Sequence, residues 1–420
     1  MKIENPKGTR DFTPPEMSQR KRVEDAVKKV LDSFGYEEVS TPIFEYAELF
    51  EVKSGSDIKE RMYVFDDKGG RKLCLRPELT ASVCRMYANE LKNSPKPLRL
   101  YYSGPMFRYE EPQRGRYREF YQIGVELLGA CGAMADAEAV CLACECLETL
   151  GLKYRLELGS IKILRGLLGE LDISGAKQDK VIALLDEGRR DELKELTDDE
   201  TLLTLIGLKG GVEEIEKARK LLEGFDEPLK AVEELGEIAG ILDGAGVSFT
   251  VDFSIARGLE YYTGLVFEVR VEGLGAQNQI CGGGRYDNLV ELFGGPATPA
   301  VGFAFGFDRV CEALKEQGVK TGEVEETVIV APVGEDACGY ALQAAGFLRR
   351  ELSGSGIKVK TEITGRKLKK VLEYASDSGA GFVVIVGGKE KDENTVTLRD
   401  MKAKTQETIS VSEAAERLLD

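Results

Sequence analysis

The sequence has no histidine and no tryptophan among its 420 residues. The lack of histidine excludes Ser-His-Asp and Cys-His catalysis, HExxH metal sites and zinc fingers with histidine ligands. Any proton transfer must therefore use Asp, Glu, Lys, Tyr, Cys or the substrate itself.

Long apolar runs are also missing. No stretch of about 18 apolar residues occurs, so we expect no membrane span and no membrane partner. The N-terminal segment MKIENPKGTRDFTPPE has no apolar region of the kind that a secretory signal needs. The nine cysteines, an odd number in a long acidic chain, indicate reduced thiols, and we expect a cytoplasmic protein.

Three of these cysteines, Cys141, Cys144 and Cys146, lie close together and invite interpretation as a metal site. However, the chain has no histidine to complete such a site and no second CxxC motif. We therefore interpret them as small hydrophobic residues on a buried helix and expect no protein-bound metal.

The formal net charge of −16 argues against non-specific coating of nucleic acid. The charge is uneven, because residues 170–240 hold 10 Lys/Arg and 20 Asp/Glu. Residues 358–370, in contrast, hold six Lys/Arg and one Asp/Glu. This second segment is a local basic patch that the total conceals.

The length predicts two or three domains. Capping-box spacing of Thr13 and Glu16, followed by apolar residues three and four apart, predicts a helix over 13–34. Another helix is expected at 136–150. Strands are expected at 36–43, 98–108, 118–127, 249–253, 265–271 and 300–307.

Two regions differ from this pattern. Residues 161–243 are rich in Leu, Glu, Lys and Asp at helical spacing without a strand pattern, which predicts a helical insertion. From 327 onward, short apolar strands alternate with helices, as in a small α/β domain, with the boundary at 319–326. Gly282–Gly284 lack the GxxxxGK[ST] phosphate-loop pattern, so we interpret them as a tight turn before a helix.

Four arginines lie between two predicted strands in the segment 108–118, RYEEPQRGRYR. Arginine pairs with phosphate oxygens through two donors at once. A solvated hairpin tip is the simpler interpretation. We favour a ligand site because Arg108 and Arg118 lie on the strands, where they can converge on one ligand.

Three further segments have both a functional and a plain structural interpretation. In 303–309, Arg309 follows a glycine-spaced strand, which suits an anion or an ordinary strand-to-helix junction. In 75–80, Glu78 and Thr80 either hold an ammonium group or begin a helix. The segment 257–264, RGLEYYTG, is either part of a site or a β-turn with packed aromatic side chains.

Taken together, these segments resemble the histidyl-tRNA synthetases, which are class II aminoacyl-tRNA synthetases, over nearly the whole chain. The opening of that family is similar to residues 7–14, and its three class II motifs are similar to 34–45, 101–126 and 300–310. Two segments specific to the family are similar to 257–269 and 282–295.

The resemblance implies an α+β fold. Residues 1–160 and 244–320 would form the class II antiparallel sheet flanked by helices, 161–243 a helical insertion and 327–420 an α/β anticodon-binding domain. It further implies activation of L-histidine by ATP with Mg²⁺, transfer to tRNA(His), and a homodimer that forms through the motif at 34–45.

The resemblance also implies roles for individual residues. The implied catalytic residues are Arg257, Arg108 and Arg309. The implied ATP-binding residues are Arg108, Arg116, Phe120 and Arg309. The implied histidine-binding residues are Glu78, Thr80, Gln122, Glu126, Arg257, Tyr261, Tyr262 and Tyr286. The implied tRNA-binding residues are Gln113, Lys367, Lys369 and Lys370. Glu111 stands where the family more often has a basic residue, which leaves the contact with the extra guanosine of tRNA(His) open.

Two other functions compete with this one. A non-catalytic regulatory subunit of ATP phosphoribosyltransferase is built on the same catalytic-domain fold, but such proteins typically lose the C-terminal domain and the arginines. A nucleic-acid-binding module with a vestigial synthetase fold would use the basic patch at 358–370. It would have no use for Arg108, Arg257 and Arg309, which this sequence retains.

Overall fold

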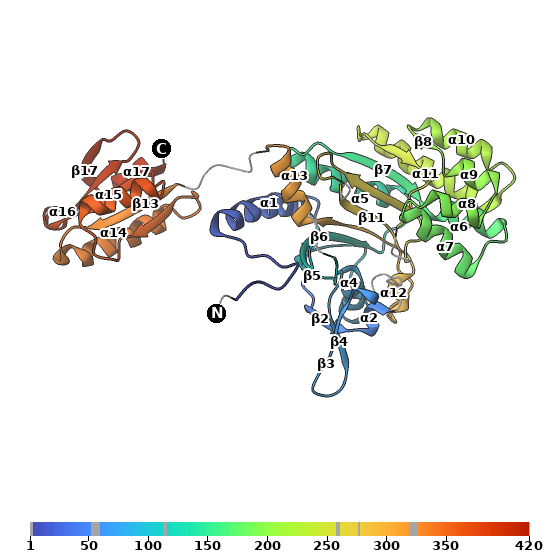
Figure 1. The fold of residues 1–420 in the computed structure, drawn as a ribbon. Coiled ribbons are helices and arrows are strands. Elements are labelled where there is room, and N and C mark those ends of the chain that lie inside the picture. Colours follow the sequence, from blue (N-terminus) through green and yellow to red (C-terminus); the bar gives the residue numbers. More distant parts are fainter. Residues whose placement is uncertain are drawn as a thin grey trace. The chain divides into compact units, whose positions relative to one another are not determined.

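The computed structural model describes residues 3–51, 59–111, 116–257, 261–275, 278–319 and 326–419. The chain divides into two compact units, Met1–Thr321 and Gly322–Asp420. Figure 1 shows both units, which are described separately below. The expected boundary at 319–326 lies mostly outside the described residues.

A nine-stranded sheet forms the centre of the first unit, in the order β1-β5-β6-β12-β11-β10-β7-β9-β8. All neighbours are antiparallel except β1–β5 and β7–β9. In spatial order, the strands are β1 (Glu37–Glu38), β5 (Leu98–Phe107), β6 (Glu119–Leu128), β12 (Ala300–Gly306), β11 (Gln279–Arg285), β10 (Leu265–Arg270), β7 (Arg155–Ser160), β9 (Thr250–Asp252) and β8 (Lys209–Gly210).

Helices cover the apolar face of this sheet. The long helix α1 (Pro14–Ser33) begins as expected, because the Glu16 carboxylate accepts a hydrogen bond from the Thr13 backbone N–H at 2.7 Å. It packs on α5 (Ala133–Thr149), which contacts β11, β12 and α11 (Asp226–Gly244). The core between these layers contains buried aliphatic and aromatic side chains such as Leu31, Val125 and Phe303.

The expected helical insertion is largely helical. Its elements are α6 (Ile161–Glu170), α7 (Gly175–Asp186), α8 (Arg190–Leu196), α9 (Glu200–Leu205), α10 (Glu213–Leu221) and α11. The expectation of no strand was wrong, because Lys209 and Gly210 form β8 and pair with β9 at the edge of the main sheet. Two residues are too few for an alternating pattern to show in the sequence.

A separate three-stranded sheet, ordered β2-β4-β3, contains β2 (Phe44–Tyr46), β3 (Tyr63–Asp66) and β4 (Lys72–Leu75). The β3–β4 hairpin projects from the rest of the unit (Figure 1). The remaining helices described in the first unit are α2 (Glu48–Glu51), α4 (Thr80–Met86), the π-helix η1 (Tyr87–Leu91), α12 (Leu289–Leu292) and α13 (Phe307–Glu316). The strand expected at 36–43 is reduced to Glu37–Glu38, since Pro42 cannot donate a ladder hydrogen bond.

The glycines 282–284 are strand residues, so the expectation of a tight turn was wrong. They lie in β11 and pair with β10 on one side and β12 on the other. A side chain on Gly283 would collide with the Gly302 carbonyl and the Phe303 side chain. Glycine is therefore required by close packing in the sheet and not by a turn.

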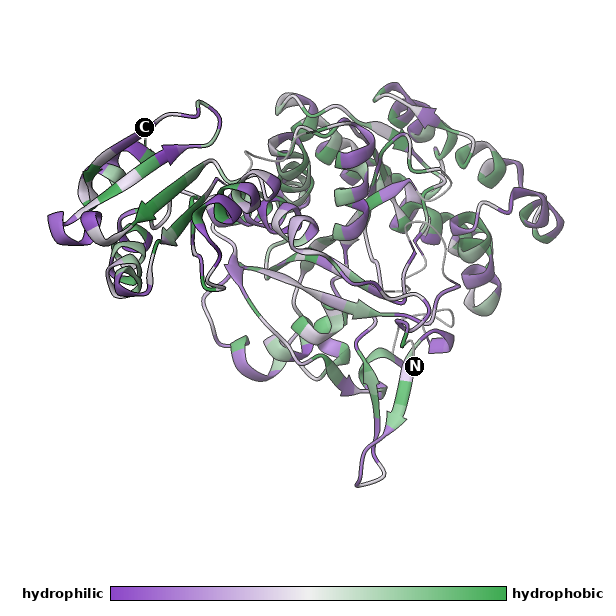
Figure 2. Ribbon diagram, turned by 60° about the vertical axis from the view of Figure 1, so that its left-hand side comes forward, coloured by the Kyte–Doolittle hydropathy of each residue, from purple (hydrophilic) through white to green (hydrophobic). Residues whose placement is uncertain are grey.

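The second unit has a five-stranded sheet ordered β14-β13-β15-β16-β17. Its elements are β13 (Thr327–Pro332), η2 (Glu335–Ala337), α14 (Cys338–Glu351), β14 (Lys358–Thr361), α15 (Leu368–Asp377), β15 (Phe382–Val386), α16 (Gly388–Glu393), β16 (Thr395–Asp400), β17 (Gln406–Ser410) and α17 (Val411–Leu419). Alternate residues of β13 face opposite ways, with Val328 and Val330 toward α14 and α17 and Ile329 toward α15. Figure 2 shows both the hydrophobic and the hydrophilic colour on this sheet, whose apolar strands are β13 and β15 at its centre.

Candidate active site

The floor of a cavity in the first unit is built from small residues in two cross-strand rows. One row joins Gly124, Ala304 and Gly282 on β6, β12 and β11. The next joins Gly302 and Gly284 on β12 and β11. Side chains in a sheet alternate between faces, so both rows point away from the covering helices. The missing side chains leave room on this face.

The cavity has a volume of about 340 Å³. It collects residues from segments that are far apart in the sequence, between Arg61 and Arg309. All twelve residues to which the resemblance gave catalytic, ATP-binding or histidine-binding roles line it, namely Glu78, Thr80, Arg108, Arg116, Phe120, Gln122, Glu126, Arg257, Tyr261, Tyr262, Tyr286 and Arg309. Their individual roles stay predictions.

Positive charge gathers at one end of the cavity, which we call the arginine end and define by Arg108, Arg116 and Arg309. The Arg309 Nη1 atom donates to the Gln279 carbonyl at 2.8 Å. Burial, followed by the charges of Arg116 and Arg108, lowers the pKa of Arg309. Three cations that repel one another form a place where a polyanion is favourable.

The Arg108 side chain is held in place by a backbone carbonyl and an aromatic ring. Its Nε atom donates to the Pro77 carbonyl at 2.9 Å, and its guanidinium lies 5.3 Å from the ring centroid of Phe120. Burial lowers the pKa of Arg108, while Glu110 and Glu78 act in the opposite direction. The Phe120 ring is half-buried and lines the cavity, so its aromatic surface is partly available to a ligand.

A different chemistry defines the acid end of the cavity, which consists of Glu126, Tyr262 and Tyr286. The Tyr286 hydroxyl donates to Glu126 Oε2. The other carboxylate oxygen, Oε1, is buried and has no hydrogen-bond partner among the described residues. A side chain on Gly302 would collide with this carboxylate, which explains why β12 has glycine there.

Burial changes the protonation of Glu126. The side chain is 1% exposed, and burial is the largest cause of a pKa that is raised to about 8. The hydrogen bond from Tyr286 lowers the pKa, and the nearby Glu78 raises it. The carboxyl is therefore mostly neutral at pH 7, and a ligand with a positive or strongly donating group would favour its ionised form.

Aromatic rings enclose the acid end. The ring centroids of Tyr261 and Tyr262 are 4.9 Å apart, and those of Tyr261 and Tyr286 are 5.7 Å apart. Both Tyr261 and Tyr262 are 7% exposed, so the wall is almost fully desolvated. Such a wall fits a planar polar ring and strengthens any hydrogen bond made inside it.

Glu78 confirms the structural one of the two interpretations that the sequence left open, and the other stays a prediction. Its carboxylate accepts from the Ala81 backbone N–H at 3.1 Å, so it does cap the start of α4. It also lines the cavity beside Thr80, and it is buried, which raises its pKa. A substrate ammonium placed here would have an acid and a hydroxyl within one helical turn.

Arg257 lies across the cavity floor. Its guanidinium occupies the space that a side chain on Gly282 would fill. The Nη1 atom donates to Glu268 at 3.1 Å, and the group lies 5.6 Å from the ring centroid of Tyr262. Its Nε atom is buried and has no hydrogen-bond partner among the described residues.

Several residues of the site escaped the sequence analysis. Arg61, Glu110, Asp186 and Glu268 also line the cavity. Glu268 had a usable signal, because it alternates with Phe267 and Val269 on a strand and therefore had to face the opposite side of the sheet. Asp186 had none, since it ends α7 in the middle of an acidic helical region.

Some predicted placements differ from the structure. Arg118 is not among the cavity-lining residues, contrary to the expectation that it converges with Arg108. Its Nε atom donates to the Glu110 carbonyl at 3.0 Å, and its guanidinium stacks 3.9 Å from the Tyr109 ring centroid. It supports the hairpin instead. Arg118 precedes β6, which begins at Glu119, so the sheet does not fix the direction of its side chain. Gln113 lies outside the described residues.

The predicted tRNA contacts Lys367, Lys369 and Lys370 lie in the second unit, at and after the N-terminus of α15, and are exposed. Lys370 forms an ion pair with Glu373 at 2.6 Å. Glu373 lies just past the basic patch at 358–370, so the patch is less positive than the sequence window suggested.

The part of the chain that the structure describes has no metal-ligand group, no disulfide and no helix that could span a membrane. Within the described ranges, no group of three or more Cys, Asp or Glu side chains is placed to hold a metal ion. All nine cysteines are free, and burial raises the pKa of Cys144 to about 12, which fits the interpretation of the cysteine cluster as packing residues. Among the described helices, none is long and apolar enough to cross a bilayer.

Comparison with known proteins agrees with this geometry. The family described as Histidyl-tRNA synthetase matches residues 8–310, and the family described as Anticodon binding domain matches 327–420. The Histidine--tRNA ligase of Archaeoglobus fulgidus is 46% identical over 98% of both chains, and that of Methanocaldococcus jannaschii is 42% identical over 98% of both.

Solved structures give the same result. The apo histidyl-tRNA synthetase of S. aureus is 30% identical, covers 100% of both chains and has a TM-score of 0.75. A Bacillus halodurans protein described as an ATP phosphoribosyltransferase regulatory subunit/histidyl-tRNA synthetase is 27% identical, with a TM-score of 0.78 over 92% of this chain and 99% of that one.

These matches first define the class: the fold is that of a class II aminoacyl-tRNA synthetase. Within that class, the chain belongs to the histidyl-tRNA synthetase family. The resemblance drawn from the sequence motifs, and the α+β fold that it implied, are thereby confirmed.

Proposed function

We propose that the protein activates L-histidine with ATP to form histidyl-adenylate and then transfers the histidyl group to the 3′ end of tRNA(His). One observation carries this proposal. A single cavity joins an end with three arginines to an end with a buried acid and two phenols. The first suits a triphosphate and the second suits an imidazole, and ATP and histidine are the two substrates that must meet.

The first step needs charge neutralisation more than proton transfer. The histidine carboxylate, which is ionised at pH 7, attacks the α-phosphorus of ATP and forms the acyl–phosphate bond. The bond to the leaving oxygen breaks, and pyrophosphate departs with that electron pair. Negative charge grows on the phosphorus oxygens, and Arg257 would stabilise it while Arg108, Arg116 and Arg309 hold the phosphates.

Mg²⁺ would enter as part of the ATP substrate. The described residues contain no cluster of three acids for a protein-held ion, so the phosphate oxygens would supply most of its ligands. Glu110 lines the cavity at the arginine end, 3.8 Å from Arg116, and would be the acid to assist. When bound, the ion supplies positive charge for the triphosphate.

Transfer to tRNA requires a proton acceptor. The terminal ribose hydroxyl attacks the activated carbonyl, and AMP leaves. A non-bridging phosphate oxygen of the adenylate would take the hydroxyl proton, so this step also needs no histidine side chain. The absence of histidine from the sequence is thus compatible with both steps.

Recognition of histidine would come from the acid end. Glu126 would accept from one imidazole nitrogen, and Tyr262 would face the other, with Tyr286 holding Glu126 in place. Glu78, Thr80 and Gln122 would hold the ammonium group. A site built around hydrogen bonds rejects analogues without them by about 10⁴–10⁵-fold, because its buried polar groups would be left unpaired.

A homodimer is part of the proposal. The three-stranded sheet exposes large apolar side chains at its surface, namely Ile43, Phe44, Tyr46, Val64 and Phe65, each at least 44% exposed. An apolar patch of this kind is typical of a protein–protein interface. A second copy of the chain is the partner that the family implies, and sedimentation at micromolar concentration would test it.

Histidine-dependent ATP–pyrophosphate exchange tests the proposed activity. We expect exchange with the wild-type protein and its loss in Arg257→Ala, with ATP binding largely retained. A regulatory subunit or a nucleic-acid-binding module would show no exchange at all. Full activity of Arg257→Ala would contradict the role assigned to that arginine.

The anticodon-binding role needs a separate test. Charge reversal at Lys367 and Lys369 should reduce aminoacylation of tRNA(His) about 10-fold, because each lost phosphate contact weakens RNA binding. Exchange should be unaffected, since it does not need tRNA. An equal loss in both assays would contradict the tRNA-binding role of these lysines.

A further inference from the structure

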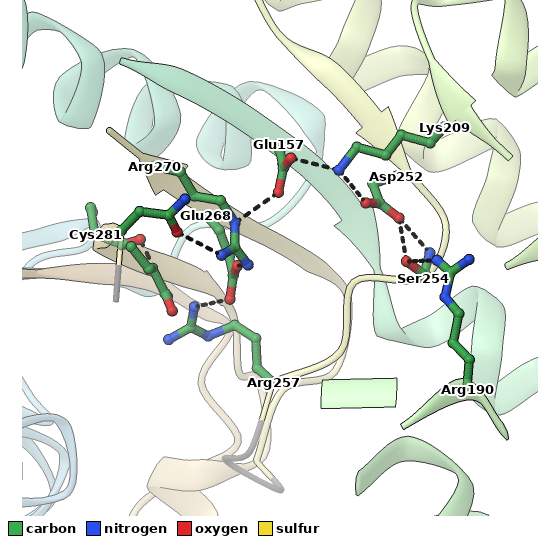
Figure 3. A network of polar contacts seen from close by, with 11 residues as sticks. Glu157, Arg190, Lys209, Asp252, Ser254, Arg257, Glu268, Arg270 and Cys281 are labelled. Carbon is green, nitrogen blue, oxygen red and sulfur yellow. Dashed lines mark hydrogen bonds and ion pairs between the residues drawn. The ribbon is translucent and has the colours of Figure 1, made fainter. Parts of the chain in front are cut away.

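A row of alternating charges crosses the sheet beside the cavity (Figure 3). Glu268 on β10 and Glu157 on β7 lie directly opposite each other in the strand register. Two like charges in that position repel. Arg270, two residues along β10 and therefore on the same face, separates them by pairing with both: its Nε atom lies 3.0 Å from Glu157, and its Nη2 atom donates to Glu268.

The row continues outward to the insertion. Lys209 of β8 lies 2.6 Å from Glu157 and 2.8 Å from Asp252, so its ammonium group bridges two acids. The insertion makes a second contact near the same point, because Ser254 donates to Asp252 at 2.6 Å and accepts from Arg190 of α8 at 3.4 Å. These contacts are the outer end of the row.

The inner end of the row reaches the reacting centre. Glu268 accepts from Arg257 at 3.1 Å through one oxygen and from Arg270 through the other. Gly282 lies opposite Glu268 on the next strand, and its missing side chain is what allows the Arg257 guanidinium to lie there. Arg257 follows a short segment after β9, so its backbone is not fixed by a ladder of its own.

We propose that Glu268 is the positioning residue for Arg257, and that Lys209 of the insertion, acting through Glu157 and Arg270, holds Glu268 in the orientation that catalysis needs. This proposal rests on the proposed function, since it assigns Arg257 to the reaction. The row gives the insertion a second link to the active site, besides Asp186 of α7, without contact between Lys209 and substrate.

The charges of the row are balanced, which explains how its three acids can be largely buried. Three cations, Arg257, Arg270 and Lys209, alternate with three acids, Glu268, Glu157 and Asp252. Removing one member takes away one partner of its neighbour, whose partly desolvated charge is then less well compensated. The neighbour then turns toward another partner, and the displacement passes along the row to Arg257.

The ion pairs of the row differ in strength because their side chains differ in solvent exposure. The Glu268 side chain is 7% exposed, whereas that of Lys209 is 48% exposed. Water and salt weaken the outer links much more than the inner ones. Substitution of Glu268 should therefore have a large effect on the reaction and substitution of Lys209 a small one, with Arg270 between them.

The first experiment measures histidine-dependent ATP–pyrophosphate exchange by Glu268→Gln. Glutamine keeps the size but removes the charge. We expect kcat to fall about 100-fold, the usual cost of a reacting group displaced by about 1 Å. The KM values for ATP and histidine should change less than about two-fold, because Arg257 acts mainly in the transition state. Glu268→Asp should recover part of kcat.

The second experiment compares Lys209→Met with a matched control, Lys162→Met. Lys162 also forms an ion pair within the insertion, 2.6 Å from Glu234, and its side chain is 39% exposed, but it is not part of the row. We expect kcat to fall about three-fold in Lys209→Met, in keeping with a half-exposed pair, and to be unchanged in Lys162→Met. Lys209→Arg should restore it.

Active-site titration by the burst of adenylate separates positioning from stability. A row that only fastens the insertion to the sheet would reduce the number of active sites and leave kcat per site unchanged. That result, or equal effects of Lys209→Met and Lys162→Met, would overturn the proposal. Absence of exchange in the wild-type protein would instead overturn the proposed function.

Discussion

Burial shifts pKa values in opposite directions at the two ends of the cavity. At the arginine end, burial and the neighbouring cations lower the pKa of Arg309, so the empty end is unfavourably positive. At the acid end, burial raises the pKa of Glu126 to about 8, so the empty end is held neutral. Each end is therefore relieved by one kind of ligand, an anion or a hydrogen-bond donor. Loss of contact with water therefore makes the arginine end selective for anions and the acid end selective for hydrogen-bond donors.

The largest expected effect comes from the arginine end. Arg309→Ala should lower histidine-dependent exchange about 10²–10³-fold, the usual cost of removing one charge-stabilising donor. Steady-state kinetics at varied ATP would measure it. The control is Arg155→Ala, which removes an exposed arginine on β7 whose side chain is 62% exposed. A similar loss in both variants would show that net charge, and not the arginine end, matters.

The next effect belongs to the acid end. Glu126→Gln should raise the KM for histidine about 100-fold, because the buried acceptor for the imidazole loses its charge. The KM for ATP should change less than about two-fold, since the phosphates lie at the other end. Equal changes in both KM values would break the division of the cavity into two ends.

Stability against pH tests the neutral state of the acid end. A carboxyl whose pKa is raised from 4.5 to about 8 in the folded protein favours folding below pH 4.5 and loses that contribution as the pH rises through 8. Glu126→Gln does not titrate. Relative to the wild type, it should therefore gain about 2–3 kcal/mol between pH 6 and pH 9. Urea unfolding at the two pH values measures this, and a constant difference would mean that Glu126 titrates normally.

The smallest effect tests the cavity floor under the acid end. Gly302→Ala would push a side chain against the Glu126 carboxylate and the Val125 carbonyl. We expect a loss of about 1–3 kcal/mol in unfolding free energy, as for other overpacked sites. Gly240→Ala, in α11 with no atom near the added carbon, should instead stabilise by about 0.5–1 kcal/mol.

Sequence patterns predicted most elements of the fold for clear physical reasons. Helix α1 has a capping box, a proline at its start and apolar spacing along its length, which all indicate the same structure. Strands β5, β6 and β12 have strong apolar content. The motifs around Arg108, Arg257 and Arg309 came from different parts of the chain, and the resemblance joined them before the structure showed their common cavity.

The features that were missed depend on contacts that no local pattern records. Gly282–Gly284 look like a turn, because glycine is common in turns, and only the neighbouring strands show that a side chain would collide. Lys209 looks like one of many surface lysines until β8 brings it to Glu157. Arg118 was misplaced because it lies just outside β6, where contacts with the Glu110 carbonyl and the Tyr109 ring direct its side chain.

The absence of imidazole from the protein has a practical consequence. Because the chain contains no histidine, every imidazole resonance from a tag-free complex with L-histidine belongs to the ligand. Nuclear magnetic resonance could therefore read the bound tautomer and its charge without isotope labelling of the protein. The resonances of the bound substrate would then show which of its ring nitrogens carries a proton at the acid end.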